Sequence, residues 1–141
     1  MIKKLLGSIR EYKKDSILAP IYVTLEVVLE VLIPFLMSMI IDRGVGEGDM
    51  PFIIRIGLIL IVSTLFSLSF GVLSGLHAAK ASAGFAKNIR KDMYYNIQDF
   101  SFSNIDQFST SSLITRLTTD ITNVQNSFQM IIRIMVRAPL M

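Results

Sequence analysis

Two long apolar segments constrain this chain more than any other feature of its sequence. They cover residues 17–41 and 56–79. At about 1.5 Å per residue, each is long enough as a helix to cross the roughly 30 Å hydrocarbon core of a bilayer. Charged residues make up only 18% of the chain, whereas soluble domains carry about 25%. The sequence therefore predicts an all-α membrane protein with two long membrane helices.

The basic N-terminal segment predicts a helix on the membrane surface over residues 1–14. Apolar residues recur there at helical spacing, and the cations between them are Lys3, Lys4, Arg10, Lys13 and Lys14. A basic amphipathic segment beside a membrane span is typical of a helix that lies in the interface. A disordered basic tail is the alternative. A nucleic-acid-binding arm is disfavoured because a long apolar segment follows, so we expect no nucleic-acid partner.

Helical periodicity and turn residues predict the remaining elements. We expect the first membrane helix over 16–42, a polar loop over 42–50 and a second helix over 51–98. The apolar stripe of the second helix continues past the membrane segment, so this helix would be about 70 Å long with more than half outside the bilayer. Residues 99–112 are rich in Ser, Asn, Asp and Thr and predict a turn. A third helix is expected over 111–141.

Two stripes of side chains predict how these helices pack. In the second helix, small residues recur every four positions at Ser63, Ser67, Gly71, Gly75 and Ala79. Such a ridge lets another helix backbone approach closely within lipid. In the third helix, apolar residues form a near-heptad seam at Leu113, Leu117, Ile121, Val124, Phe128, Ile131 and Met135. Because polar residues lie between them, we expect this helix to begin in water, packed on another helix.

The distribution of cations predicts the orientation in the membrane. Five cations precede the first apolar segment, and Lys80, Lys87, Arg90 and Lys91 follow the second. Cytoplasmic flanks of membrane helices carry an excess of Lys and Arg. We therefore expect the N-terminus and residues 80–130 in the cytoplasm, with residues 42–50 on the outer side.

Three short stretches give the chain a resemblance to a known family. Residues 112–120 read SLITRLTTD, residues 40–42 read IID and residues 137–140 read RAPL. In this order and spacing they resemble the N-terminal part of an ABC exporter transmembrane domain, of the bacterial multidrug or lipid type. Residues 110–112 read TSS, where the family often has Thr-Gly-Glu. The resemblance implies that residues 1–141 are a partial transmembrane domain, without a nucleotide-binding domain, of a longer transporter.

The resemblance also implies a mechanism and partners. It implies a multi-pass plasma-membrane protein with its N-terminus in the cytoplasm, in which ATP hydrolysis drives alternating access. Nucleotide-binding domains and a second transmembrane half would be its partners, in a homodimer or heterodimer, with ATP and Mg²⁺ in the complete transporter. A coupling helix over 103–108 would contact the nucleotide-binding domain through Asn104, Ile105, Asp106, Gln107 and Phe108. The chain has no GxxxxGK[ST] phosphate loop, so we expect no catalytic residue, no nucleotide site and no cofactor in this chain alone.

A few polar residues are candidates for a site. Glu26 and Glu30 lie one turn apart within the first apolar segment, where carboxylates are costly and face a cavity or a partner. Two interpretations remain open: attraction of a cationic substrate or a coupled proton, and an ion pair or hydrogen bond to another helix. Arg116 and Asp120 form an i, i+4 pair that we interpret as structural, and His77 as an interfacial residue. With no Cys and one His, no metal site is expected.

Two other classes of protein remain as alternatives. A two-span sensory or signalling protein with a cytoplasmic helical hairpin fits the cation pattern and the heptad seam. Against it, the sequence turns back at 99–112 and becomes apolar again after Ile131. A small channel or membrane-assembly subunit fits the small-residue ridge. Against that, the chain stops within an apolar stretch, so we expect a longer protein.

Overall fold

The computed structural model describes residues 7–98 and 110–140. Within these ranges the chain is helical almost throughout and contains no strand, so the predicted all-α fold is confirmed. The long helices are α2 (Lys13–Met39), α3 (Met50–Gln98) and α6 (Ile121–Arg137). The shorter elements are η1 (Arg10–Tyr12), η2 (Ile40–Val45), α5 (Thr110–Thr115), η3 (Arg116–Asp120) and η4 (Ala138–Leu140).

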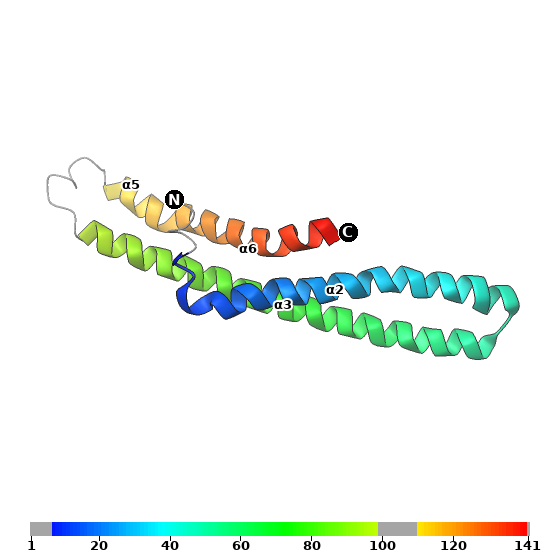
Figure 1. Cartoon of the computed structure of the whole chain (residues 1–141). Coiled ribbons are helices and arrows are strands. Elements are labelled where there is room, and N and C mark those ends of the chain that lie inside the picture. Colours follow the sequence, from blue (N-terminus) through cyan, green and yellow to red (C-terminus); the bar gives the residue numbers. More distant parts are fainter. Residues whose placement is uncertain (1–6, 99–109, 141) are drawn as a thin grey trace.

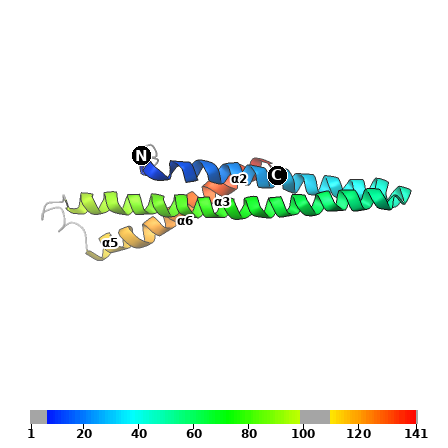
Figure 2. The ribbon, with the colours of Figure 1, turned by 90° about the horizontal axis from the view of Figure 1, so that it is seen from below.

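Helices α2 and α3 form an antiparallel hairpin, and α6 contacts both of them (Figure 1). Helix α2 lies along the N-terminal half of α3, whereas α5 and the start of α6 lie along its C-terminal half. In the view from below, α6 crosses α3 so that its C-terminal end lies beside α2 (Figure 2). The middle of the molecule is therefore the place where all three long helices meet.

The surface of the hairpin is apolar. Two helical stretches, Arg10–Val45 and Met50–Gln98, are long and apolar enough to cross a membrane. Many large apolar residues along them are more than half exposed, including Val31, Phe35, Ile61, Leu65 and Leu68. A continuous apolar surface of this kind is rare on a soluble monomer. Lipid tails are as apolar as these side chains, so a bilayer covers such a surface without penalty.

The connection between α2 and α3 is shorter than the sequence predicts. The predicted loop over 42–50 is wrong for most of its length, because a π-helical segment, η2, continues α2 to Val45. The chain reverses at Gly48, whose φ of 71° is readily adopted only by residues without a Cβ. Asp49 then caps α3 by accepting a hydrogen bond from the Phe52 backbone N–H at 3.1 Å. Only one of the three glycines in this segment thus makes the turn.

The small-residue ridge of α3 packs against α2, but it does not follow the predicted positions throughout. Ser63 and Ser67 are buried, and Gly71 lies against a side chain of α2. Beyond Gly71 the buried residues are Ser74 and Ala78, one position before the predicted Gly75 and Ala79. The reason is geometric: a stripe of every fourth residue rotates by about 40° per step around a helix of 3.6 residues per turn. Contact with one partner requires some steps of three.

The C-terminal half of α3 has a hydrophobic core of its own. It consists of Phe85, Ala86 and Ile89 from α3 and Ile121 from α6, with Ile9, Met93, Leu117 and Phe128 packed around them. The rings of Phe85 and Phe128 stack with their centroids 4.4 Å apart. This confirms that the third helix packs on another helix near its start.

The predicted heptad seam of the third helix is only partly buried. Leu117, Ile121 and Phe128 join the core, whereas Ile131 and Met135 are 52% and 69% exposed. Val124 is also exposed, and the side chain of Leu113 lies outside the described part of the structure. A single straight partner, α3, covers only a narrow stripe of α6, and α6 crosses it rather than following it (Figure 2). The seam therefore breaks where the helices diverge.

Candidate functional site: a charged cluster between three helices

Glu26 and Glu30 meet an arginine from the end of α6. One guanidinium nitrogen of Arg137, Nη2, donates to Glu30 Oε1 at 2.8 Å and to Glu30 Oε2 at 2.9 Å. Its Nη1 lies 3.6 Å from Glu26 Oε1. The Glu30 and Arg137 side chains are 29% and 38% exposed, and that of Glu26 is 13% exposed. Arg137 is thus bound to Glu30 by short hydrogen bonds and reaches Glu26 only by a longer ion pair.

Gly71 of α3 makes room for the Glu26 carboxylate. A Cβ at this position would lie 2.9 Å from Glu26 Oε1, which is closer than side chains tolerate without moving. Glu26 Oε2 is buried and has no hydrogen-bond partner among the residues that the structure describes. A buried carboxylate oxygen without a donor is costly. The Glu26 carboxylate therefore retains unused hydrogen-bonding capacity.

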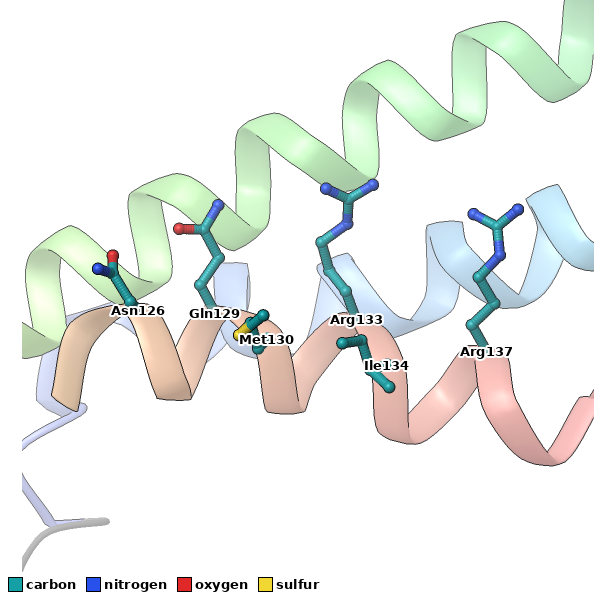
Figure 3. A pocket seen from close by; sticks show the side chains of 6 residues that line it. All are labelled: Asn126, Gln129, Met130, Arg133, Ile134 and Arg137. Atoms are coloured by element: carbon teal, nitrogen blue, oxygen red, sulfur yellow. The ribbon is translucent and has the colours of Figure 1, made fainter. Parts of the chain in front are cut away.

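Arg133 adds a second cation to the same place. It lies one turn before Arg137, and both side chains extend from α6 on the face that also carries Asn126 and Gln129 (Figure 3). Within residues 7–98 and 110–140, Arg133 makes no ion pair or hydrogen bond. Its guanidinium group offers five N–H donors. The cluster thus contains an unpaired donor group as well as an unpaired acceptor.

Three of the four charged side chains, those of Glu26, Glu30 and Arg133, border a groove of about 490 Å³ between the three helices. Its lining combines the charges with two hydroxyl groups and an apolar wall: Glu26, Glu30, Ile33, Thr64, Ser67, Leu68, Gly71, Val72 and Arg133. The two carboxylates and the two guanidinium groups sum to zero net charge. Because isolated charges are expensive inside a bilayer, a neutral cluster is the arrangement that an apolar span tolerates best.

Sequence reasoning found one side of this cluster and missed the other. It singled out Glu26 and Glu30 and left open an ion pair or a cavity role; the structure has an ion pair at Glu30 and a groove bordered by both. Arg133 and Arg137 were not recognised as site residues. Their i, i+4 spacing matches that of the two glutamates, and this match within apolar surroundings is the signal that would have found them.

At the other end of α2, polar contacts attach the N-terminal segment to α3. Arg10 Nη2 donates to Asp92 Oδ1 at 2.8 Å, and Asn88 Nδ2 donates to the backbone oxygen of Ser8 at 2.8 Å. The ring of Tyr12 lies directly on Gly84, which leaves no space for a Cβ there. Of the predicted surface helix over 1–14, residues 1–6 lie outside the described part. The remainder is fixed to α3 rather than free.

His77 also joins α2 to α3. Its Nδ1 lies 2.7 Å from Asp15 Oδ1, and Tyr22 stacks on its ring with the centroids 5.5 Å apart. These contacts give His77 an inter-helix role. No cluster of three or more metal-ligating residues occurs in the part of the chain that the structure describes.

The other predicted residues are placed as follows. Arg116 and Asp120 lie at the two ends of η3, a π-helical segment, where both are exposed. This segment is wound more loosely than the α-helix on which the predicted i, i+4 pairing depends. The predicted coupling residues, Asn104, Ile105, Asp106, Gln107 and Phe108, lie outside the described residues, and their role stays a prediction.

These features define a helical membrane domain. It has a long apolar hairpin, a third helix that returns to the hairpin, and a cluster of charged residues without net charge where the three helices meet. The family model of the ABC transporter transmembrane region matches residues 16–141. The chain belongs to this family.

Several curated proteins are similar to this chain in sequence. The chain is 39% identical over 140 residues to YfiB of Bacillus subtilis, an uncharacterised ABC transporter ATP-binding protein; the match covers 99% of this chain and 24% of YfiB. It is 27% identical over 143 residues to HepA of Nostoc, a heterocyst differentiation ATP-binding protein; that match covers 88% of this chain and 24% of HepA. An uncharacterised ABC transporter ATP-binding protein of Mycobacterium bovis is 26% identical over 133 residues, 94% of this chain and 23% of its own length. The chain thus spans about a quarter of these relatives.

Proposed function

We propose that this chain is the first part of the membrane domain of an ATP-driven ABC exporter of the multidrug, lipid or peptide type. The observation that carries the proposal is α3: 49 residues of uninterrupted helix, apolar-surfaced at one end and joined to a hydrophobic core at the other. Such a helix is a rigid connection between the membrane and a site outside it. In an exporter, this connection transmits the closure of nucleotide-binding domains to the transport pathway.

The proposed orientation places the N-terminus and the α3–α6 core in the cytoplasm and the turn at Gly48 outside. The cation pattern supports it, because the C-terminal half of α3 carries Lys80, Lys87, Arg90 and Lys91. In this orientation the protein is a multi-pass protein of the plasma membrane. A nucleotide-binding domain on the cytoplasmic side would then contact the segment 103–108, which lies outside the described residues.

The proposed partners are nucleotide-binding domains and a second transmembrane half, in a homodimer or a heterodimer. The similar proteins are named ATP-binding proteins, and the chain matches about a quarter of their length. This supports a complete protein that binds ATP with Mg²⁺ in a region other than the one described here. ATP hydrolysis belongs to that region, and this chain contributes the membrane path and its coupling.

The sensory-protein alternative finds less support than the exporter. The family match extends over 16–141 and so includes the returning third helix, which a two-span receptor does not require. The same family match also disfavours the alternative of a small channel subunit.

Crosslinking tests the proposal. In the full-length protein, with other cysteines removed, Ile105→Cys or Phe108→Cys is expected to crosslink to the nucleotide-binding domain, and ATP is expected to change the yield. Leu65→Cys is the control, because Leu65 lies on the exposed apolar surface of α3, many turns before that helix ends at Gln98. A crosslink only between two copies of the 103–108 segment, unaffected by ATP, would contradict the coupling role and favour a signalling hairpin.

A further inference from the structure

We propose that the groove between α2, α3 and α6 binds the headgroup of a zwitterionic membrane lipid, one that carries both an ammonium and a phosphate group. The inference extends the proposed function and rests on it only in placing the groove within a bilayer. Three observations support it: unused hydrogen-bonding capacity of both signs, zero net charge, and an apolar wall beside the polar groups.

The groove offers acceptors for an ammonium group. A carboxylate accepts about four hydrogen bonds, whereas Arg137 makes two short contacts to Glu30 and one longer contact to Glu26. Glu26 Oε2 has no donor within the described residues. A lipid ammonium group that enters from the side of Glu30, or that draws the Glu26 side chain outwards, supplies the missing donors.

The same groove offers a donor group for a phosphate. Arg133 borders the groove and makes no ion pair or hydrogen bond with the described part of the chain. A planar guanidinium group matches phosphate oxygens with paired N–H donors. Thr64 and Ser67 border the same space with hydroxyl groups. Their hydroxyls provide further polar contacts for a headgroup.

Charge balance selects the zwitterion over a simple ion. Glu26, Glu30, Arg133 and Arg137 already sum to zero. A cationic or an anionic ligand would leave one net charge in an apolar surrounding, and such a charge is costly there. A zwitterion satisfies both unpaired groups and keeps the site neutral. Ile33, Leu68 and Val72 line the groove beside them and form an apolar surface for the start of the acyl chains.

Competition binding tests the inference. The detergent-solubilised full-length protein, without ATP, is titrated with a phosphatidylethanolamine that carries a fluorophore on its acyl chain. Unlabelled phosphatidylethanolamine, phosphatidylglycerol and an alkylammonium of equal chain length then compete. We expect phosphatidylethanolamine to compete about tenfold better than either of the others, since each lacks one charge-assisted contact.

Variants assign the two contacts. Arg133→Gln is expected to remove the preference over the alkylammonium, and Glu26→Gln the preference over phosphatidylglycerol, by about tenfold each. Arg133→Lys keeps the positive charge and is expected to restore part of the binding. Lys80→Gln removes an exposed cation of α3 outside the groove and serves as the matched control. Each variant is first shown to elute as a single species of wild-type size.

Three results would overturn the inference. Equal competition by all three amphiphiles would mean that the groove does not distinguish between headgroups. Binding of none of them would mean that another part of the protein fills the groove. An equal loss with Lys80→Gln would mean that the effect is general. None of these results bears on the ATP-dependent crosslink at 105 or 108, so failure here is distinguishable from failure of the proposed function.

Discussion

The two ends of α3 are packed by different means. In its N-terminal half the contact with α2 is made by small residues such as Ser63, Ser67 and Gly71, while large apolar side chains point outwards. In its C-terminal half large apolar side chains such as Phe85 and Ile89 point inwards, and Phe85 stacks on Phe128. In lipid, burial of apolar groups gives no driving force between helices, so close backbone approach holds them together. In water, apolar burial is the dominant force. One continuous helix thus packs by close backbone approach in its N-terminal half and by apolar burial in its C-terminal half.

The largest effect is expected for Phe85→Ala, which removes the centre of the core at the C-terminal half. Truncation of a buried Phe to Ala costs about 3–5 kcal/mol, and Phe85 is only 4% exposed. Hydrogen–deuterium exchange of the α3 backbone around this residue should become faster by the corresponding factor. Phe66→Ala is the control, because Phe66 is 55% exposed on the other half of the same helix. Equal acceleration in both variants would refute the contrast between the two halves.

Arg137→Gln should have the next largest effect, in the region where the end of α6 contacts α2. It leaves Glu30 without its short hydrogen bonds, and an unsatisfied, partly buried charged group costs about 1–3 kcal/mol. Thermal unfolding of the full-length protein in detergent measures the loss. In a double-mutant cycle with Glu30→Gln, the second substitution should cost much less than it does alone. Strict additivity of the two losses would show that the ion pair contributes nothing. Arg55→Gln, an exposed cation of α3, should have little effect.

Gly71→Ala tests whether α2 and α3 approach each other closely along the N-terminal half of α3. The added methyl group meets the Glu26 carboxylate, which has to move, and we expect a destabilisation of about 1 kcal/mol. Gly75→Ala is the matched control one turn away, where a Cβ meets nothing within 4 Å. It should be neutral or stabilising by up to about 1 kcal/mol, because alanine loses less backbone entropy. Unfolding midpoints of the two variants should move in opposite directions. A lower midpoint for Gly75→Ala than for Gly71→Ala would contradict this assignment of the helix face.

The smallest effect is expected for Arg10→Gln, which removes a contact to the C-terminal half of α3. The ion pair between Arg10 and Asp92 is exposed, with 51% and 36% of the two side chains accessible. Exposed pairs contribute about 0.2–1 kcal/mol, and salt screens them. The difference in unfolding midpoint between wild type and variant should shrink at high ionic strength. Lys14→Gln, an exposed cation with no ion pair among the described residues, should show no such salt dependence.

The sequence predicted the long elements well because their signals are long. Apolar segments and helical periodicity extended over many turns, and the all-α fold followed from them. The turn at 42–50 was mispredicted because glycine has several uses. Gly44 lies against Ile53, where a Cβ does not fit, and only Gly48 has a positive φ. In the sequence, a glycine needed for a close contact and a glycine needed for a turn look the same.

The candidate site was harder to predict because it depends on contacts across the fold. Glu26 and Glu30 were conspicuous as charges inside an apolar segment. Arg137 is separated from Glu30 by 107 residues, and its sequence surroundings did not distinguish it from an arginine at a membrane surface. Only the crossing of α6 towards α2 brings these residues together. The same crossing explains why the heptad seam ends early, since periodicity along one helix does not fix the angle between two.

The proposed function depends most on α3 crossing the membrane and continuing into the cytoplasm. Cysteine accessibility with a membrane-impermeant maleimide tests this in cells that express the full-length protein without other cysteines. Val45→Cys, next to the turn, should be labelled in intact cells. Tyr94→Cys, near the other end of α3 and exposed, should be labelled only after permeabilisation, and Leu65→Cys in neither condition. Labelling of Tyr94→Cys in intact cells would contradict the orientation and the role of this helix as a rigid connection from the membrane to the cytoplasm.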